Sequence, residues 1–167
     1  MESKSEQGAI DLLAEWQARE RELQAVYRTW GVVPREQVAG KAGIEMFRAM
    51  LAGEVPAPPI TRTLDFMLVE AEVGRVVFQG RPGFAHYNPM GTVHGGWFAT
   101  LLDSALGCAV QSAQPAGKAY TTAELKINIV RPLTDKVPLV RAESKLIHSG
   151  ARMATADGRL TGPDGKL

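Results

Sequence analysis

Apolar residues at helical spacing run through the first thirty residues of the chain. Residues from about Ala9 to Trp30 combine good helix formers with an apolar stripe that faces away from several carboxylates and arginines. The stripe comprises Leu12, Leu13, Trp16, Leu23, Val26, Tyr27 and Trp30. Gly31 and Pro34 then stop the pattern, so we expect one amphipathic helix here.

A second, shorter helix is predicted around Ile44 to Leu51, and a proline-rich connector follows it. This connector, EVPAPPI, is expected to be extended because residues before proline avoid the helical region. We therefore divide the chain into a helical extension at 1–40 and a domain at 41–167.

Strand patterns dominate the chain after the connector. The segment LDFMLVEAEVGRVVFQG holds two β-rich runs around a turn near Val73 and Gly74, which predicts an antiparallel hairpin. In AELKINIV, the apolar residues Ala123, Leu125, Ile127 and Ile129 alternate with polar ones, which predicts a strand with one buried face. Further strands are expected at about 138–147 and 151–160.

Between these strands lies one apolar helix. Its residues Phe98, Leu101, Leu102, Ala105, Leu106 and Ala109 follow helical spacing and predict burial on nearly all sides. The order of elements favours an α+β fold, in which an antiparallel sheet packs one face on this helix.

The chain ends with TGPDGKL, a turn sequence that normally leads into a partner strand. Only Lys166 and Leu167 follow this turn. We expect either that the final strand is missing or that the sheet obtains it in another way.

Composition narrows the choice of partners. A net charge of +1 gives no broad basic surface for nucleic acid, and no segment has the roughly 20 apolar residues of a membrane span. A single cysteine, Cys108, excludes an internal disulfide and a cysteine-rich zinc site, and its position on the apolar helix favours packing over nucleophilic chemistry. These features, with an acidic N-terminus, predict a cytoplasmic protein.

One carboxylate stands alone in the apolar helix region. The 36 residues between Arg81 and Lys118 contain Asp103 as their only formally charged side chain, although 22% of the whole chain is charged. A carboxylate in such surroundings can activate water or attack a carbonyl directly.

Potential oxyanion donors precede that carboxylate in NPMGTVHGGWFATLLD. Gly95 and Gly96 leave the backbone open where the helix begins, and a helix N-terminus presents unpaired N–H groups. The side-chain amide of Asn88 is a further donor of the kind that polarises a carbonyl. His94, at the helix start, is expected to orient the loop by hydrogen bonding rather than to titrate in catalysis.

The motif NPMGTVHGG followed by LLDSALG resembles the PaaI-type acyl-CoA thioesterases of the hot-dog superfamily. The resemblance extends from about Ala42 to the end, and residues 1 to about 40 exceed the usual family core. It implies a long helix wrapped by an antiparallel sheet, with two subunits forming the working unit.

The resemblance also assigns residues. It places the catalytic acid at Asp103, the oxyanion donors at the Gly95 N–H and the Asn88 side chain, and a hydroxyl residue at Thr122, with Thr121 beside it. His94 and Gly96 fall in the substrate-binding motif. The family needs no metal or redox cofactor.

Other residues are candidates for holding the substrate. Met90, Trp97 and Phe98 are expected to form an acyl pocket with room for aryl or medium chains. Cationic residues, which can contact the phosphates of CoA, are Arg131, Lys145 and Arg152.

The sequence thus predicts an acyl-CoA thioesterase that releases a free acid and CoA, with Asp103 as general base or nucleophile. Two rivals stay open: a hot-dog hydratase, which would use a histidine, and a non-catalytic acyl-CoA binder or regulatory protein.

The spacing of the predicted site residues indicates how many chains form one site. Gly95 and Asp103 are eight residues apart, which is about 12 Å along one helix. One thioester carbon cannot touch both, so we expect the two groups of one site to come from different chains of a homodimer, or of a dimer of dimers.

Overall fold

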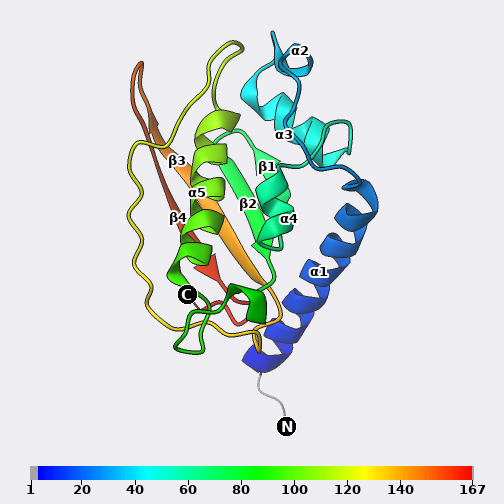
Figure 1. Cartoon of the computed structure of the whole chain (residues 1–167), viewed down its shortest axis with the longest axis vertical. Coiled ribbons are helices and arrows are strands. Elements are labelled where there is room, and N and C mark those ends of the chain that lie inside the picture. Colours follow the sequence, from blue (N-terminus) through cyan, green and yellow to red (C-terminus); the bar gives the residue numbers. More distant parts are fainter. Residues whose placement is uncertain (1–3, 167) are drawn as a thin grey trace.

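The chain folds into a four-stranded sheet with helices on both of its faces (Figure 1). The computed structural model describes residues 4–166. The helices are α1 (Lys4–Val26), α2 (Arg35–Val38), α3 (Gly43–Leu51), α4 (Pro59–Thr63), the 3-10 turn η1 (Phe84–His86) and α5 (Gly95–Ser112). The strands are β1 (Phe66–Glu72), β2 (Arg75–Gly80), β3 (Val140–Ser149) and β4 (Ala154–Thr161).

The sheet is antiparallel throughout, with strand order β1-β2-β3-β4. The predicted hairpin is confirmed: β1 and β2 are joined at Val73 and Gly74, and Gly74 adopts the positive φ of 78° that this tight turn requires. The two later strands are also confirmed, although each begins two or three residues after its predicted start.

The predicted apolar helix is α5, and it packs on one face of the sheet (Figure 1). Leu101, Ala105 and Ala109 are fully buried there. The helix approaches β2 closely, because a Cβ atom added at Gly80 would lie 2.9 Å from the ring of Trp97. This contact makes Trp97 part of the core.

The helical extension covers the opposite face of the sheet. Gln79 and Arg141 are cross-strand neighbours; the Gln79 amide donates to the Trp16 carbonyl, and the Arg141 guanidinium lies 4.7 Å from the centre of the Trp16 ring. Glu20, itself buried, pairs with Arg81 at 2.6 Å. The extension is thus packed on the domain rather than separate from it.

The predicted helix boundaries differ from the structure in three respects, the first of which is that the first helix begins at Lys4 rather than at about Ala9. The first helix ends at Val26, not near Trp30, because Thr29 and Gly31 instead exchange backbone hydrogen bonds with Ala57. The connector was expected to contain no helix, but α4 begins inside it at Pro59, where the first helical position tolerates proline.

The strand predicted from AELKINIV does not form in the single chain. Residues 119–130 run alongside α5 (Figure 1) without a backbone hydrogen bond to any other described residue. The predicted buried face is also wrong here, since only Ile127 among residues 119–130 is even half-buried. A strand requires a hydrogen-bonded neighbour, and neither edge of this segment has one.

A groove separates this segment from β4. It has a volume of about 430 Å³, its floor is Phe98, Leu102 and Leu106 of α5, and its walls are residues 126–131 and 156–160. The turn after β4 directs the chain back along that strand, and the Gly162 amide donates to the Lys166 carbonyl. The further strand expected after this turn stays a prediction.

Candidate active site

Asp103 and Thr122, which the resemblance assigns as site residues, lie together. The Thr122 hydroxyl donates to Asp103 Oδ1 at 2.9 Å, which joins the extended segment to the middle of α5. The Asp103 side chain is half-buried, and no cation is paired with it among residues 4–166. One carboxylate oxygen is therefore held in place, and no ion pair neutralises the group.

The start of α5 offers a free backbone donor. The Gly95 amide has no acceptor in the described part of the chain, while the next amide, of Gly96, donates to the ring Nδ1 of His94 at 2.8 Å. His94 thus caps the helix, which is the orienting role expected for it. A helix N-terminus with one unpaired amide is suited to a developing oxyanion.

Asn88 lies beside this amide but is held within its own loop. Its Oδ1 accepts from the backbone amides of Met90 and Thr92, and its Nδ2 donates to the Thr92 hydroxyl at 2.9 Å. One of the two hydrogens on Nδ2 is left for a substrate. Thr92 was not predicted as a site residue, although its position four residues after Asn88 in a tight loop is a usable signal.

Gly95 and Asn88 face a groove of about 340 Å³. The other residues around it are Thr92, Val93, Phe98, Ile129, Val130, Arg131 and Pro132. It adjoins the groove beside β4, because Phe98, Ile129, Val130 and Arg131 contact both. Asp103 borders neither groove, so the predicted donors and the predicted acid of one chain lie at separate places along α5.

The predicted substrate-binding residues do not all lie at the groove that Gly95 and Asn88 face. Trp97 is buried, donates from its indole to the Leu64 carbonyl and stacks on His86, so it lines no groove. Met90 is 86% exposed, and Thr121 is exposed as well. Phe98 is the predicted pocket residue that does line the groove.

Arg131 lies at the groove but already has partners. Its guanidinium contacts both carboxylate oxygens of Asp164, at 3.2 and 3.3 Å, and the Lys166 carbonyl. An incoming phosphate would have to compete with this carboxylate. Of the other two candidate cations, Arg152 lies in the β3–β4 turn. Lys145 lies in the middle of β3, opposite Asp157, and pairs loosely with Glu143 at 3.8 Å.

Cys108 is a packing residue, as expected. It packs against the hydrophobic core, and burial together with the nearby Asp103 carboxylate raises the pKa of its thiol to about 12. The thiol is therefore protonated at neutral pH and a poor nucleophile.

Two features are absent from residues 4–166. No three histidine, cysteine, aspartate or glutamate side chains converge there as metal ligands would. None of the described helices has the length and apolarity needed to cross a bilayer.

Comparison with known proteins agrees with this fold. Residues 90–167 match a family model described as "Thioesterase superfamily". The chain is 26% identical to the phenylacetic acid degradation-related protein of Ralstonia eutropha JMP134, over 69% of this chain and 87% of that one, with a TM-score of 0.63. No functionally curated protein matches it.

Two further solved structures are similar. A mutant of the phenylacetic acid degradation protein PaaI from Thermus thermophilus is 26% identical, over 65% of this chain and 90% of that one, with a TM-score of 0.57. A hypothetical thioesterase protein of Streptococcus pneumoniae, solved with coenzyme A, is 23% identical, over 61% and 79% of the two chains, with a TM-score of 0.53. At that identity the last likeness shows the fold alone.

These findings define a hot-dog fold protein, with an antiparallel sheet packed around α5. Within that fold, the predicted resemblance to PaaI-type thioesterases is confirmed.

Proposed function

We propose that this protein is an acyl-CoA thioesterase and that Asp103 is its catalytic carboxylate, acting as general base or nucleophile. The observation that carries the proposal is the solitary, half-buried carboxylate of Asp103, which the Thr122 hydroxyl holds at 2.9 Å. The matched superfamily supports thioester chemistry, and the coenzyme A bound to the similar streptococcal protein supports CoA as the carrier.

In the proposed reaction, the thioester oxygen accepts hydrogen bonds from the Gly95 amide and the free Nδ2 hydrogen of Asn88. Asp103 either removes a proton from water as it attacks the carbonyl or attacks the carbonyl itself to form an anhydride that water then opens. In both routes the C–S bond breaks, the acid is released, and the CoA sulfur leaves as a thiolate that takes up a proton. Neither route involves a metal or a redox cofactor.

The proposal includes a homodimer, because a single chain separates the two halves of the site. The exposed segment 119–130 supports it, since it has two unpaired backbone edges and exposed apolar side chains at Leu125, Ile129 and Val130. Pairing of such a segment with a second copy would satisfy one edge. The single, half-buried free cysteine fits a reducing compartment, and we keep the cytoplasm as the proposed location.

The hydratase rival gains no support from the histidines. His94 uses Nδ1 to cap α5, and His86 accepts from the Gly83 amide with its own Nδ1 and stacks on Trp97. Both rings therefore have a local role. A non-catalytic binder is distinguished by the experiment that follows.

The test is the release of free thiol from a panel of aliphatic and aryl acyl-CoAs, for the wild type and for Asp103→Asn. We expect the wild type to hydrolyse at least one thioester and Asp103→Asn to lose about 10²- to 10⁴-fold in kcat, because an amide cannot accept the proton. Asp11→Asn, at an exposed position on α1 that borders neither groove, is the matched control and should keep the wild-type rate.

Two results would contradict the proposal. Retention of most turnover by Asp103→Asn would remove Asp103 from the mechanism. If the wild type released no thiol from any thioester but bound CoA, the protein would be a binder.

A further inference from the structure

Gly107 forms a notch on α5 that a tyrosine fills. It lies one helical turn after Asp103, on the same side of the helix, and it is buried. A Cβ atom added at Gly107 would overlap the phenol of Tyr120. Glycine inside a helix lowers helix stability by about 1 kcal/mol relative to alanine. The contact between Gly107 and Tyr120 offsets this loss of helix stability.

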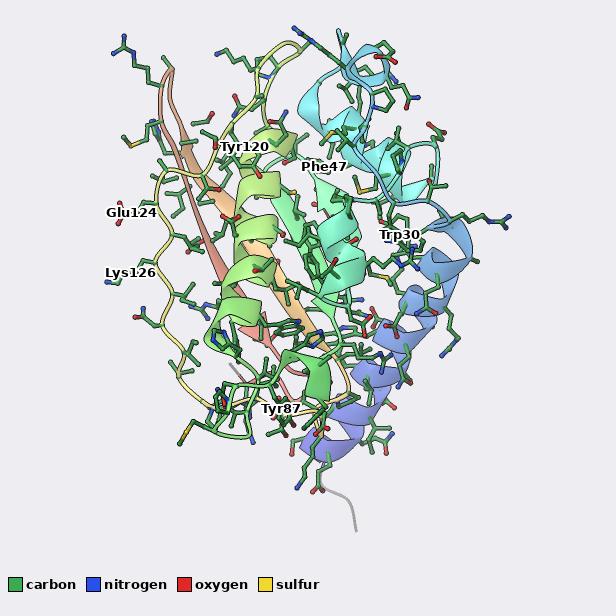
Figure 2. All side chains as sticks on the ribbon, viewed as in Figure 1. Trp30, Phe47, Tyr87, Tyr120, Glu124 and Lys126 are labelled. Carbon is green, nitrogen blue, oxygen red and sulfur yellow. The ribbon has the colours of Figure 1, made fainter. Side chains whose placement is uncertain are left out.

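Tyr120 belongs to the same segment as Thr122, two residues before it. Figure 2 shows Tyr120 beside the C-terminal half of α5, whereas Glu124 and Lys126 point away from the helix. In an extended segment, residues i and i+2 project to the same side, so Tyr120 and Thr122 both face α5. Neither resemblance nor motif indicates Tyr120, but this two-residue spacing from Thr122 is visible in the sequence.

The two contacts match in spacing. Asp103 and Gly107 are separated by about 6 Å along the helix, at 1.5 Å per residue. Thr122 and Tyr120 are separated by about 6.6 Å in an extended chain, at 3.3 Å per residue. With Thr122 at Asp103 and Tyr120 at Gly107, the segment runs antiparallel to α5 and is fixed to it at two points.

Little else holds this part of the segment. In the described chain, residues 119–130 make no backbone hydrogen bonds, and their side chains are almost all exposed. Tyr120 as a whole is 40% exposed, but its phenol lies directly against Gly107. There burial, with the nearby Cys108 thiol and Asp103 carboxylate, raises the pKa of the Tyr120 hydroxyl.

We propose that Tyr120, seated against Gly107, is a positioning residue that holds the segment on α5 so that Thr122 reaches Asp103. This rests on the proposed function, since it deepens the role of the same carboxylate. Tyr120 itself touches neither substrate nor reacting atoms in this account. It acts through Thr122.

The first test needs no enzymatic activity and uses Cys108, the single cysteine, which adjoins Gly107 and lies near Tyr120. Its labelling rate by a disulfide reagent is measured in the folded, full-length protein at pH 8. Tyr120→Ala, which removes the ring, and Gly107→Ala, which displaces it, should each raise the rate at least tenfold. Tyr120→Phe keeps the ring and should stay within twofold of the wild type.

The same assay tests whether the two contacts act together. Thr122→Val breaks the bond to Asp103 while leaving Tyr120 in place, and it should raise the labelling rate severalfold because the segment loses one of its two attachments. An unchanged rate in Thr122→Val or in Tyr120→Ala would overturn the proposal.

The second test is a double-mutant cycle on kcat. Gly107→Ala alone should lower kcat about tenfold with KM within twofold, and Tyr120→Phe should restore most of what Tyr120→Ala loses. In a Thr122→Ala background, Gly107→Ala should cause no further loss, because its effect passes through Thr122. If the kcat losses of Gly107→Ala and Thr122→Ala multiplied in the double variant, Gly107 would have a general structural role and the proposal would be overturned. A wild type without hydrolysis would refute the proposed function instead. The labelling results alone would then decide the role of Tyr120.

Discussion

At the first position of α5, Gly95 offers a site where one hydrogen-bond donor can be removed with little other change. The preceding residue, His94, has φ −63° and ψ 138°, a conformation that a following proline permits. Proline is also well tolerated at the first helical position, where its missing N–H breaks no helical bond.

We therefore predict that Gly95→Pro keeps the fold and lowers kcat about 10²- to 10³-fold, as expected for the loss of one oxyanion donor. Gly95→Ala is the matched control. It retains the N–H, and its Cβ would meet only the flexible end of Ile129 at 3.3 Å, so it should keep most activity. Thiol release and thermal unfolding are measured for both, and equal losses in the two variants would mean that the amide is not a donor.

Individual site residues were predictable to different degrees. The resemblance named Asp103 and Thr122 as site residues but did not predict the hydrogen bond between them. The orienting role of His94 followed from its place at the helix start. Trp97 and Phe98 are neighbours on one helix, however, and the sequence could not tell which ring enters the core. The deciding feature is Gly80 on β2, which makes room for Trp97 and is far away in sequence.

Among the elements, α1 is one to which the resemblance assigns no role, since it lies outside the part of the chain that resembles the family. Its contacts nevertheless reach three strands: Arg19 donates to the Val69 carbonyl of β1, and Trp16 packs against Gln79 of β2 and Arg141 of β3. Leu23 of this helix and Tyr27, the residue that follows it, both belong to the hydrophobic core. The helix is thus an integral layer of the fold.

We predict that Trp16→Ala destabilises the protein by about 3–5 kcal/mol, the usual cost of truncating a buried tryptophan. Trp30→Ala is the control, because Trp30 is 40% exposed and contributes mainly a cation–π contact with Arg62, worth on the order of 1 kcal/mol. Chemical denaturation measures both free energies of unfolding. Equal, small losses would show that α1 is not firmly packed on the sheet.

Elements whose stability comes from nearby residues were predicted well. The β1–β2 hairpin and α5 carry their own turn and apolar pattern, and both are confirmed. The segment 119–130 has the alternation of a strand, but its neighbours are not supplied by residues close in sequence. Pattern alone cannot show whether a strand will find a partner in the same chain.

For the whole molecule, the central question is whether one site contains residues from two chains. Within α5, Gly95 and Asp103 are separated by about 12 Å along the helix axis, at 1.5 Å per residue. Two copies related by a two-fold axis would each contribute the start of α5 to one site and its middle to the other.

Complementation between two inactive variants tests this arrangement most directly. Chains carrying Asp103→Ala and Gly95→Pro, with different affinity tags, are co-expressed, and the mixed dimers are isolated. One site of a mixed dimer would contain both substitutions, while the other would pair a native Gly95 with a native Asp103.

The account predicts that each homodimer is nearly inactive in thiol release and that the mixed dimer recovers up to half the wild-type activity per dimer. Size-exclusion chromatography with light scattering confirms that dimers are compared with dimers. Mixed dimers that are folded and bind CoA but release no thiol would contradict a shared site, and so would a wild-type protein that hydrolyses thioesters as a monomer.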